Sequence, residues 1–465
     1  MASSLRGFWA PHSRYNQRIR FLTPLDRRIF HLALPALGAL IAEPLFVLTD
    51  TALVGHLGAE PLAGLGIGSA ILQTAIGLLI FLAYATTPAV ARRLGAGDRP
   101  GAIRGGIDGL WLALGIGVII VALGVPSSRW LVELFGATEP VAVAAETYLS
   151  ISLWGMPAML IVIAATGLFR GLQDTKTPLV VAVAGFALNA LLNVLFIYGL
   201  GLGIAGSALG TVVAQWSMAL VYLVIAVGAA KASGTTVRPG LSGVRSAAGS
   251  GFWLLLRTAS LRAAMLATVY VATGFGVTQL AALQIALTLF SMLAFALDAL
   301  AIAGQAMIGH GLGAEDLPLV ASITRRLIFH GLLGGVALGT VIAALAWVIG
   351  PVFTSDAAVQ ALLTGTLLVM AIGVPLAGFV FVLDGVLIGA GDARYLAITG
   401  SLNLIAYLPL LIWVDLAWVN VAGPNPDLLW LWAAFGFGYM GARALTLGLR
   451  MRGTRWLVTG SRQPT

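Results

Sequence analysis

Cysteine is absent from this 465-residue sequence, and charged residues make up only 9% of it. Without cysteine the chain has no disulfide, no cysteine metal site and no thiol nucleophile. Soluble proteins carry roughly 25% charged residues, whereas 59% of this chain is hydrophobic. No soluble fold could bury so much apolar surface. The medium around most of the chain must therefore be lipid.

Signatures of several enzyme classes are also missing. The glycine-rich run GLGLG at 199–203 is not followed by the Lys and the Ser or Thr of a phosphate loop. The sequence contains no ATPase signature, no zinc motif and no nucleophile elbow. We therefore expect no cofactor and no catalytic site. Transport, if the chain performs it, would take its energy from an ion gradient.

Long apolar runs dominate what is present. A membrane-spanning helix needs about 20 mostly apolar residues. The sequence predicts an all-α integral membrane protein with twelve such helices, near residues 30–55, 62–90, 105–125, 143–168, 178–199, 204–229, 252–274, 280–307, 327–349, 359–387, 395–414 and 428–449. The first run has no short apolar core followed by a cleavage site, so we expect no cleaved signal peptide.

The basic residues predict how the chain crosses the membrane. The net charge is +8, and all of the 26 Lys and Arg residues except Arg129 fall at the N-terminus or in every second loop. Loops rich in Lys and Arg stay in the cytoplasm. We therefore expect a multi-pass protein of the cell (plasma) membrane with both termini cytoplasmic.

The sequence repeats itself at an offset of 218 residues. LAGLGI at 62–67 matches LAALQI at 280–285, and LGAGDRP at 94–100 matches LGAEDLP at 312–318. The repeat predicts two six-helix lobes in parallel orientation, related by a pseudo-twofold axis along the membrane normal. The expected segments are a cytoplasmic N-terminal segment 1–28, an N-lobe 29–230, a polar linker 231–250, a C-lobe 251–450 and a cytoplasmic tail 451–465.

Two carboxylates in the first span are the strongest candidates for function. Asp50 lies in the apolar stretch LFVLTDTALVGHLG at 45–58, and Glu43 lies two helical turns earlier on roughly the same face. An ionisable side chain inside a span is costly and usually functional. Alternatively, Asp50 could mark the helix end, and Glu43 could be a structural carboxyl. Pro44 between them is expected to kink the helix.

Neutral polar residues in the fifth and sixth spans could complete a site. Asn189 and Asn193 are four residues apart and share a helix face, and Thr211 follows in the next span. Their oxygens near a carboxylate could bind a small cation or stabilise a protonated acid. The alternative is ordinary hydrogen bonding between helices.

The second lobe carries its own acids, Asp298 and Asp384, at positions where the first lobe has Ile80 and Thr166. We expect Glu43, Asp298 and Asp384 to line the substrate cleft, with interhelical pairing as the alternative. Three histidines without ligand-like partners nearby are expected at the membrane interface: His56, His310 and His330. Four aspartates occupy equivalent loop positions in the two halves and are expected to cap helices. They are Asp98, Asp174, Asp316 and Asp392.

Several motifs resemble the MATE (multidrug and toxic compound extrusion) transporters, in their DinF-like branch. They are EPLFVLTDTALVGHLG at 43–58, ARRLGAGD at 91–98, RGLQDTKTPL at 170–179, LDALAIAGQAMIGHGLGAED at 297–316 and FVLDGVLIGAGDARY at 381–395. The resemblance covers nearly the whole chain. It implies antiport, in which organic and often cationic compounds are exported in exchange for H⁺ or Na⁺. It also implies that Asp50, Asn189, Asn193 and Thr211 couple the cation.

Many members of that family have an aspartate where this chain has Asn193. The pocket then holds one matching carboxylate, which favours H⁺, because burial disfavours the charged form of an acid. A Na⁺ site of one carboxylate and neutral oxygens is the alternative. On this hypothesis, protonation of Asp50 changes the packing of the first helix and lowers the affinity for a cationic substrate. The substrate then leaves outward, and deprotonation toward the cytoplasm resets the cycle.

Two other functions fit the sequence less well. A lipid-linked saccharide flippase of the same superfamily would need a basic cleft for pyrophosphate, and the cleft candidates here are acidic. An intramembrane aspartyl enzyme could use Asp298 and Asp384, but the repeat has no role in it. The expected partners are small organic substrates and the lipid bilayer, with no nucleic acid. A monomer is expected, because the two lobes form a cleft without a partner.

Overall fold

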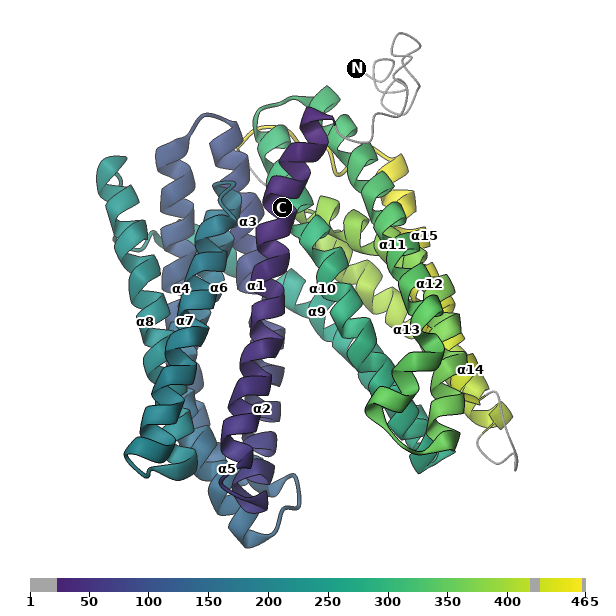
Figure 1. Ribbon diagram of the computed structural model, residues 1–465. Helices are drawn as coiled ribbons and strands as arrows, with labels where there is room; N and C mark the ends of the chain where they lie inside the picture. Colours follow the sequence, from purple (N-terminus) through teal and green to yellow (C-terminus); the bar gives the residue numbers. More distant parts are fainter. Residues whose placement is uncertain (1–22, 419–426, 462–465) are drawn as a thin grey trace. The chain divides into compact units, whose positions relative to one another are not determined.

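The computed structural model describes residues 23–418 and 427–461, and within these ranges the chain is nearly all helix with no strand (Figure 1). Its helices are α1 (Pro24–Gly55), α2 (Ala59–Leu79), α3 (Phe81–Gly95), α4 (Arg99–Glu133), α5 (Glu139–Ser152), η2 (Leu153–Gly155), α6 (Met156–Gly171), α7 (Lys176–Val194), η3 (Leu195–Gly199), α8 (Gly203–Ala232), α9 (Leu241–Phe275), α10 (Val277–Gly313), α11 (Leu317–Phe353), α12 (Ala357–Gly389), α13 (Ala393–Trp418), α14 (Asp427–Ala433), η4 (Ala434–Tyr439) and α15 (Met440–Arg452).

Each of the twelve expected spans coincides with helical structure. In the described ranges, eleven stretches are long and apolar enough to cross a membrane. The expected twelfth span, 428–449, corresponds to α14, η4 and α15, in which a π-helical turn at Ala434–Tyr439 interrupts the α-helix. The all-α membrane fold is therefore confirmed.

The repeat appears in the positions at which the helices begin. Helices α10, α11 and α12 begin 218 residues after α2, α4 and α5, respectively. The turn before α2 and the turn before α10 use glycines with φ of 123° and 122°, at Gly58 and Gly276. Side chains other than glycine rarely adopt such angles. The same local chemistry therefore builds the corresponding turn in both halves.

Aspartates cap helices where the sequence predicts it, with one exception. Asp98 accepts a hydrogen bond from the Gly101 amide at 2.8 Å, and Asp316 accepts one from the Leu319 amide at 2.9 Å. Asp174 accepts hydrogen bonds from two amides at the start of α7. Asp392 instead forms an ion pair of 2.6 Å with Arg450 of α15. Its prediction as a simple cap is therefore wrong, because the fold brings a distant cation beside it.

The chain divides into two compact units. Unit 2 comprises 34–252, and unit 1 comprises the described residues up to Ala33 together with those from Trp253 onward. The division passes through α1 and through α9, so it differs from the expected lobe boundaries at residues 29 and 251. The expected linker 231–250 is helical from Leu241. Of the N-terminal segment 1–28, residues 1–22 lie outside the described ranges, and α1 already begins at Pro24.

Side chains of α4 form two hydrogen bonds with the loop 233–240 and hold it in unit 2. The buried carboxylate of Asp108 accepts a hydrogen bond from the Gly240 amide at 2.8 Å. The Trp111 indole donates to the Val237 carbonyl at 2.9 Å. Asp108 thus supplies an acceptor at the N-terminus of α9, where helix amides lack partners. This explains why the first turns of α9 belong to unit 2.

The first turn of α1 is fastened to unit 1. Asp26 is buried and accepts hydrogen bonds from the Thr23 amide and hydroxyl, both at 2.7 Å. Its other carboxylate oxygen lies 2.8 Å from Nε2 of His330 and 3.6 Å from Nε of Arg326. His330 is itself buried in α11. The sequence gives no sign of this pair, because Asp26 and His330 lie 304 residues apart in the chain.

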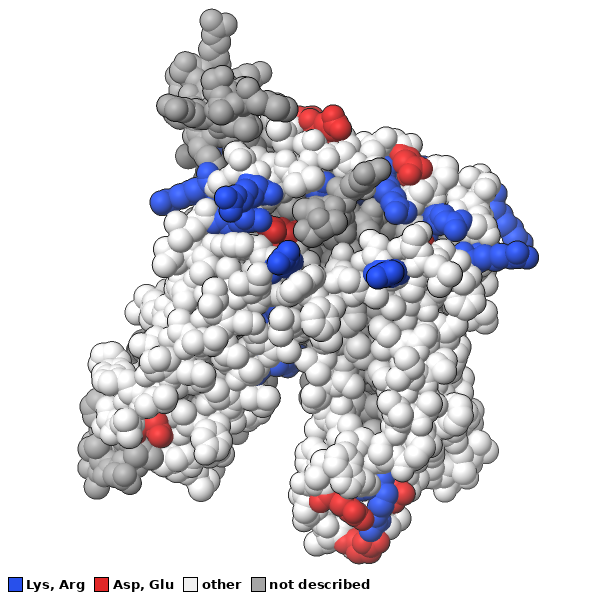
Figure 2. Space-filling model, turned by 180° about the vertical axis from the view of Figure 1, so that it is seen from behind, with Lys and Arg blue, Asp and Glu red and all other residues white. Residues whose placement is uncertain are grey.

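The surface of each unit agrees with a membrane setting. Figure 2 shows Lys and Arg side chains gathered near one end of the helices in each unit. Large apolar side chains are exposed along the helices, such as Leu191 and Val224 in unit 2 and Ile372 and Leu416 in unit 1. Arg129, the expected exception to the basic pattern, is surrounded by Glu133, Glu139 and Glu146. An apolar belt between polar ends is the signature of a lipid-embedded bundle.

Replacing Asp26 by alanine should lower the free energy of unfolding by roughly 3 kcal/mol, because the buried His330 and the half-buried Arg326 lose their anion. The matched control is Asp98→Ala. Asp98 is an exposed helix cap, so its loss should cost roughly 1 kcal/mol. Unfolding in SDS, followed by circular dichroism, measures both variants. Equal losses would show that the Asp26 contacts to α11 add nothing beyond capping.

Candidate functional site

Asp50 of α1 is buried inside unit 2 and carries two strong hydrogen bonds. Asn193 Nδ2 of α7 donates to Asp50 Oδ1 at 2.6 Å, and the Ser207 hydroxyl of α8 donates to the same oxygen at 2.8 Å. Bonds to an ionised acceptor are about twice as strong as neutral ones. The carboxylate therefore joins three helices that are far apart in the sequence.

The polar chain continues away from Asp50 through neutral groups. Asn193 Nδ2 also lies 3.2 Å from Asn189 Oδ1, and Asn189 Nδ2 donates to the Thr211 hydroxyl at 3.0 Å. The spacing of four residues on α7 places both amides on one face. The structure thus brings together all four residues that the sequence selects for cation coupling. What they do remains a prediction.

Close helix packing positions the asparagine. A Cβ atom built on Gly210 would lie 2.1 Å from Asn193 Oδ1, and one on Gly206 would lie 2.7 Å from the backbone of Phe196. Only glycine allows α8 to approach the end of α7 so closely. Directly after Asn193 and Val194, the π-helical turn η3 begins. Such turns re-aim side chains within a helix and often occur at functional sites.

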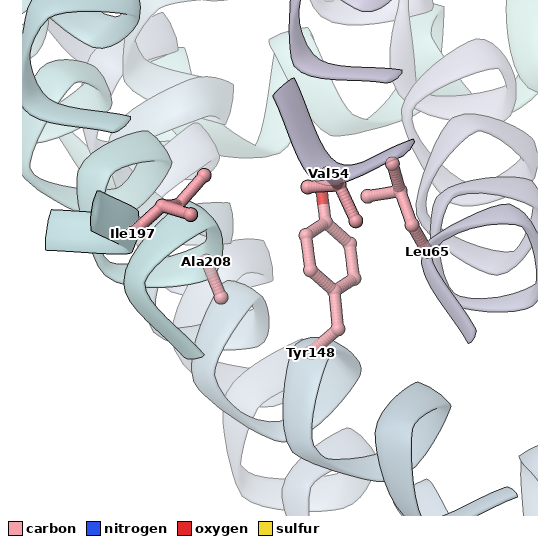
Figure 3. Packing of buried hydrophobic residues seen from close by; sticks show 5 residues of the cluster. All are labelled: Val54, Leu65, Tyr148, Ile197 and Ala208. Atoms are coloured by element: carbon pink, nitrogen blue, oxygen red, sulfur yellow. The ribbon is translucent and has the colours of Figure 1, made fainter. Parts of the chain in front are cut away.

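Tyr148 of α5 is a further hydrogen-bonding partner of the Asp50 carboxyl. Figure 3 shows its ring among Val54, Leu65, Ile197 and Ala208, with the hydroxyl oxygen pointing toward Val54. Val54 follows Asp50 by one helical turn. This apolar cluster covers the site on the side of the α1 C-terminus. Water is therefore excluded from that side.

A cavity of about 70 Å³ opens beside Asp50 within unit 2. Glu43, Gln73 and Gln215 line it together with Asp50 and Thr211. Its apolar lining includes a stacked pair of rings, Phe46 and Phe186, with centroids 5.0 Å apart, and the side chain of Met218. With Asn189, the cavity thus combines two acids, three side-chain amides and an aromatic wall.

Four residues of this site were missed from the sequence: Ser207, Tyr148, Gln73 and Gln215. Ser207 could have been found, because it precedes Thr211 by four residues and shares its face. Tyrosines are common at membrane interfaces, so nothing in the local sequence marks Tyr148 as buried. Gln215 could have been found in the same way, because it follows Thr211 by four residues on the same helix. Gln73 comes from the second span, and only the fold brings it to the cavity.

The candidates of the second lobe belong to unit 1 and are not among the residues that line this cavity. Asp298 is half-buried in α10. Asp384 is buried in α12, forms an ion pair with Arg257 and lies 3.2 Å from Nη2 of Arg443. Asp384 and its two arginine partners border a cavity of about 10 Å³, which is room for about one water. The sequence pattern of basic residues groups Arg257 and Arg443 with the cytoplasmic loops. Instead they lie within α9 and α15, because Asp384 compensates their charge.

No group of three or more His, Asp or Glu side chains suited to a metal ion occurs in the part of the chain that the structure describes. The Asp50 site offers one carboxylate, and its nearest neighbours present donors. Whether a cation other than a proton binds there is left as a prediction.

Ser207→Ala should destabilise unit 2 by roughly 2 kcal/mol, because a hydrogen bond to a charged group is lost in a buried site. Ser217→Ala on the same helix is the control. Its exposed hydroxyl bonds only to the Val213 carbonyl of its own helix at 2.8 Å, so we expect almost no change. Thermal unfolding of the two purified proteins compares them. Identical midpoints would mean that Ser207 does not stabilise the site.

Comparison with known proteins identifies one family over most of the chain. The MatE family matches residues 35–195 and 255–413, one segment in each unit. DNA damage-inducible protein F of Escherichia coli is 34% identical over 44% of this chain and 45% of its own length. Protein DETOXIFICATION 43 of Arabidopsis thaliana is 29% identical over 91% of this chain and 90% of its own length. The match with the E. coli protein thus spans less than half of that relative.

Solved structures agree on the fold. VcmN, a MATE transporter of Vibrio cholerae, superimposes with a TM-score of 0.83 at 22% identity, over 93% of this chain and 98% of its own. A MOP superfamily transporter from Pyrococcus furiosus gives a TM-score of 0.82 at 22% identity, over 92% and 96%. None of these relatives favours an intramembrane enzyme. The chain therefore belongs to the MATE family.

Proposed function

We propose that this protein is a secondary antiporter, which exports organic compounds of cationic or amphiphilic character in exchange for H⁺. The observation that carries the proposal is the buried Asp50, held by Asn193 and Ser207 at the wall of a cavity. Family membership supports it. Relatives named as multidrug resistance proteins include MdtK of Edwardsiella ictaluri, which is 31% identical over 42% of this chain.

The donors around Asp50 support a proton rather than Na⁺ as the coupling ion. A hard cation such as Na⁺ needs several oxygen ligands. Asn193 presents its amide nitrogen to the carboxylate, and Ser207 presents its hydroxyl proton. A proton needs only the carboxylate itself, and burial favours the neutral form of an acid. To bind Na⁺, the side-chain amide of Asn193 would have to flip so that its oxygen, and not its nitrogen, faces Asp50.

The cavity lining supports an organic cation as cargo. Glu43 and Asp50 supply negative charge, and the rings of Phe46 and Phe186 supply an aromatic face. Cations are attracted to such faces. Pockets for drug-sized ligands measure roughly 300–1,000 Å³, whereas this cavity holds about 70 Å³. Cargo binding therefore requires the helices around it to separate.

The transport cycle that we propose uses this charge. Cargo binds while Asp50 is ionised. Protonation from outside neutralises Asp50, weakens its hydrogen bonds to α7 and α8 and lets α1 repack. The cavity then has less negative charge, so the cationic cargo leaves outward. Loss of the proton to the cytoplasm restores the first state. The proline residues Pro35 and Pro44 within α1 are places where a helix bends at low cost.

Membrane placement follows from the same reasoning. A multi-pass protein with nearly all its basic residues on one side places that side in the cytoplasm. We accordingly propose the cell membrane, cytoplasmic termini and a monomeric transporter. A flippase for lipid-linked saccharides is not favoured, because the acids that line the unit 2 cavity would repel a pyrophosphate.

Asp50→Asn should abolish proton-driven efflux, because asparagine cannot exchange a proton. Purified protein in liposomes, loaded with a fluorescent organic cation, should release it under an imposed pH gradient in the wild type. The variant should match protein-free liposomes. Glu60→Gln, an exposed acid at the start of α2, is the control and should transport normally. Full activity of Asp50→Asn would remove Asp50 from the mechanism.

Asn193→Asp should make transport respond to Na⁺. The substitution is nearly isosteric and replaces an amide donor, 2.6 Å from Asp50, by a second carboxylate. Two carboxylates in contact require a cation between them, either a proton or a metal ion. The same liposome assay under a Na⁺ gradient, without a pH gradient, measures the change. Wild-type protein should not respond. If both proteins respond equally, the site already takes Na⁺.

A further inference from the structure

Unit 1 has a second, larger recess on helices that the proposed transport site does not use. It has a volume of about 700 Å³ and is lined by residues of α11, α12 and α15. Both α11 and α15 pack against α12. Its apolar lining includes Ile328, Phe379, Leu383, Leu445 and Leu449, and its one charged lining residue is Arg452. The volume lies within the roughly 300–1,000 Å³ of ligand pockets.

We propose that this recess is a binding site for one anionic phospholipid. The acyl chains lie against the leucine and phenylalanine side chains, and the phosphate lies at the mouth beside Arg452 and Arg325. Basic recesses between membrane helices on the cytoplasmic side bind anionic head groups in this way. The proposal is independent of the transport cycle.

The positions of the two arginines suit a head group. Arg452 ends α15, and Arg325 lies near the start of α11, so both are at the basic end of unit 1. Arg325 precedes Ile328, a lining residue, by one turn and shares its face. Side chains on a helix lean toward its N-terminus, which carries the Arg325 guanidinium toward the mouth. Long basic side chains reach the head groups from such positions.

Neighbouring arginines have protein partners, whereas Arg325 and Arg452 have none within residues 23–418 and 427–461. Arg326 lies 3.6 Å from Asp26, Arg443 lies 3.2 Å from Asp384, and Arg450 lies 2.6 Å from Asp392. Among the residues that the structure describes, Arg325 and Arg452 form no ion pair and no hydrogen bond. Both side chains are exposed. Two unpaired cations beside an apolar recess complement the charge and shape of an anionic lipid.

A glycine keeps the recess open. Gly448 lines it, and a Cβ atom built there would meet nothing within 4 Å. By contrast, a Cβ atom on Gly385 in α12 would lie 2.6 Å from the backbone of Ala301. Gly385 is thus needed for helix packing, but Gly448 is not. A larger side chain at 448 can fill the recess without moving a helix.

The experiment uses the full-length protein in detergent, titrated with phosphatidylglycerol or with phosphatidylcholine of the same acyl chains, and native mass spectrometry counts the bound lipids. We expect one phosphatidylglycerol to bind more tightly than phosphatidylcholine. Arg325→Ala and Arg452→Ala should each weaken phosphatidylglycerol about fivefold, since a basic residue near the surface contributes about 1 kcal/mol. Arg238→Ala, an exposed arginine of unit 2, is the charge control and should change nothing.

Gly448→Leu tests the recess itself, and it should weaken phosphatidylglycerol without changing any charge. Gly334→Leu is the matched control, because Gly334 in α11 also has open space around its Cβ position but does not line the recess. Equal affinity for the two lipids, or equal affinity of the two leucine variants, would overturn the proposal. If Gly448→Leu does not fold, unchanged binding by the double variant Arg325→Ala/Arg452→Ala would overturn it as well.

Discussion

A charge inside an apolar bundle must be met by hydrogen-bond donors, and the Asp50 carboxylate sets that requirement for unit 2. Two of its donors come from α7 and α8, so the end of α7 and the start of α8 must lie at the right depth beside α1. The closeness of α8 depends on Gly206 and Gly210. The π-helical turn η3 follows directly after the asparagine face. The local irregularities of this unit thus gather around one carboxylate.

The same helix ties that carboxylate to the other unit. The first turn of α1 is held in unit 1 through Asp26 and His330, whereas Asp50 lies in unit 2. The division falls between Ala33 and Leu34, directly before Pro35. A second connection, α9, is divided in the same way. In the proposed cycle, a change in the bonding of Asp50 acts on a helix whose first turn is held in unit 1.

Much of this could be predicted from the sequence, for identifiable reasons. Helix positions follow from apolar runs and from the 218-residue repeat, both of which are local patterns. Asp50, Asn189, Asn193 and Thr211 were found because polar residues are rare in such spans. The partners of buried ions could not be found, because pairs such as Asp26 with His330 and Asp384 with Arg443 join residues distant in sequence. Arginines near a span end resemble interfacial ones until the fold supplies an anion.

The two units show how one repeated fold can separate two uses of a buried acid. In unit 1, Asp384 lies between two guanidinium groups, and an acid paired with cations keeps its charge. In unit 2, neutral side chains donate to Asp50, and a proton can replace their interactions without leaving a cation unpaired. Removing the charge of Asp384 would leave Arg257 and Arg443 without their anion inside the protein, which is strongly destabilising. Reversible protonation is therefore compatible with folding in unit 2, and unit 1 is suited to a fixed structural charge.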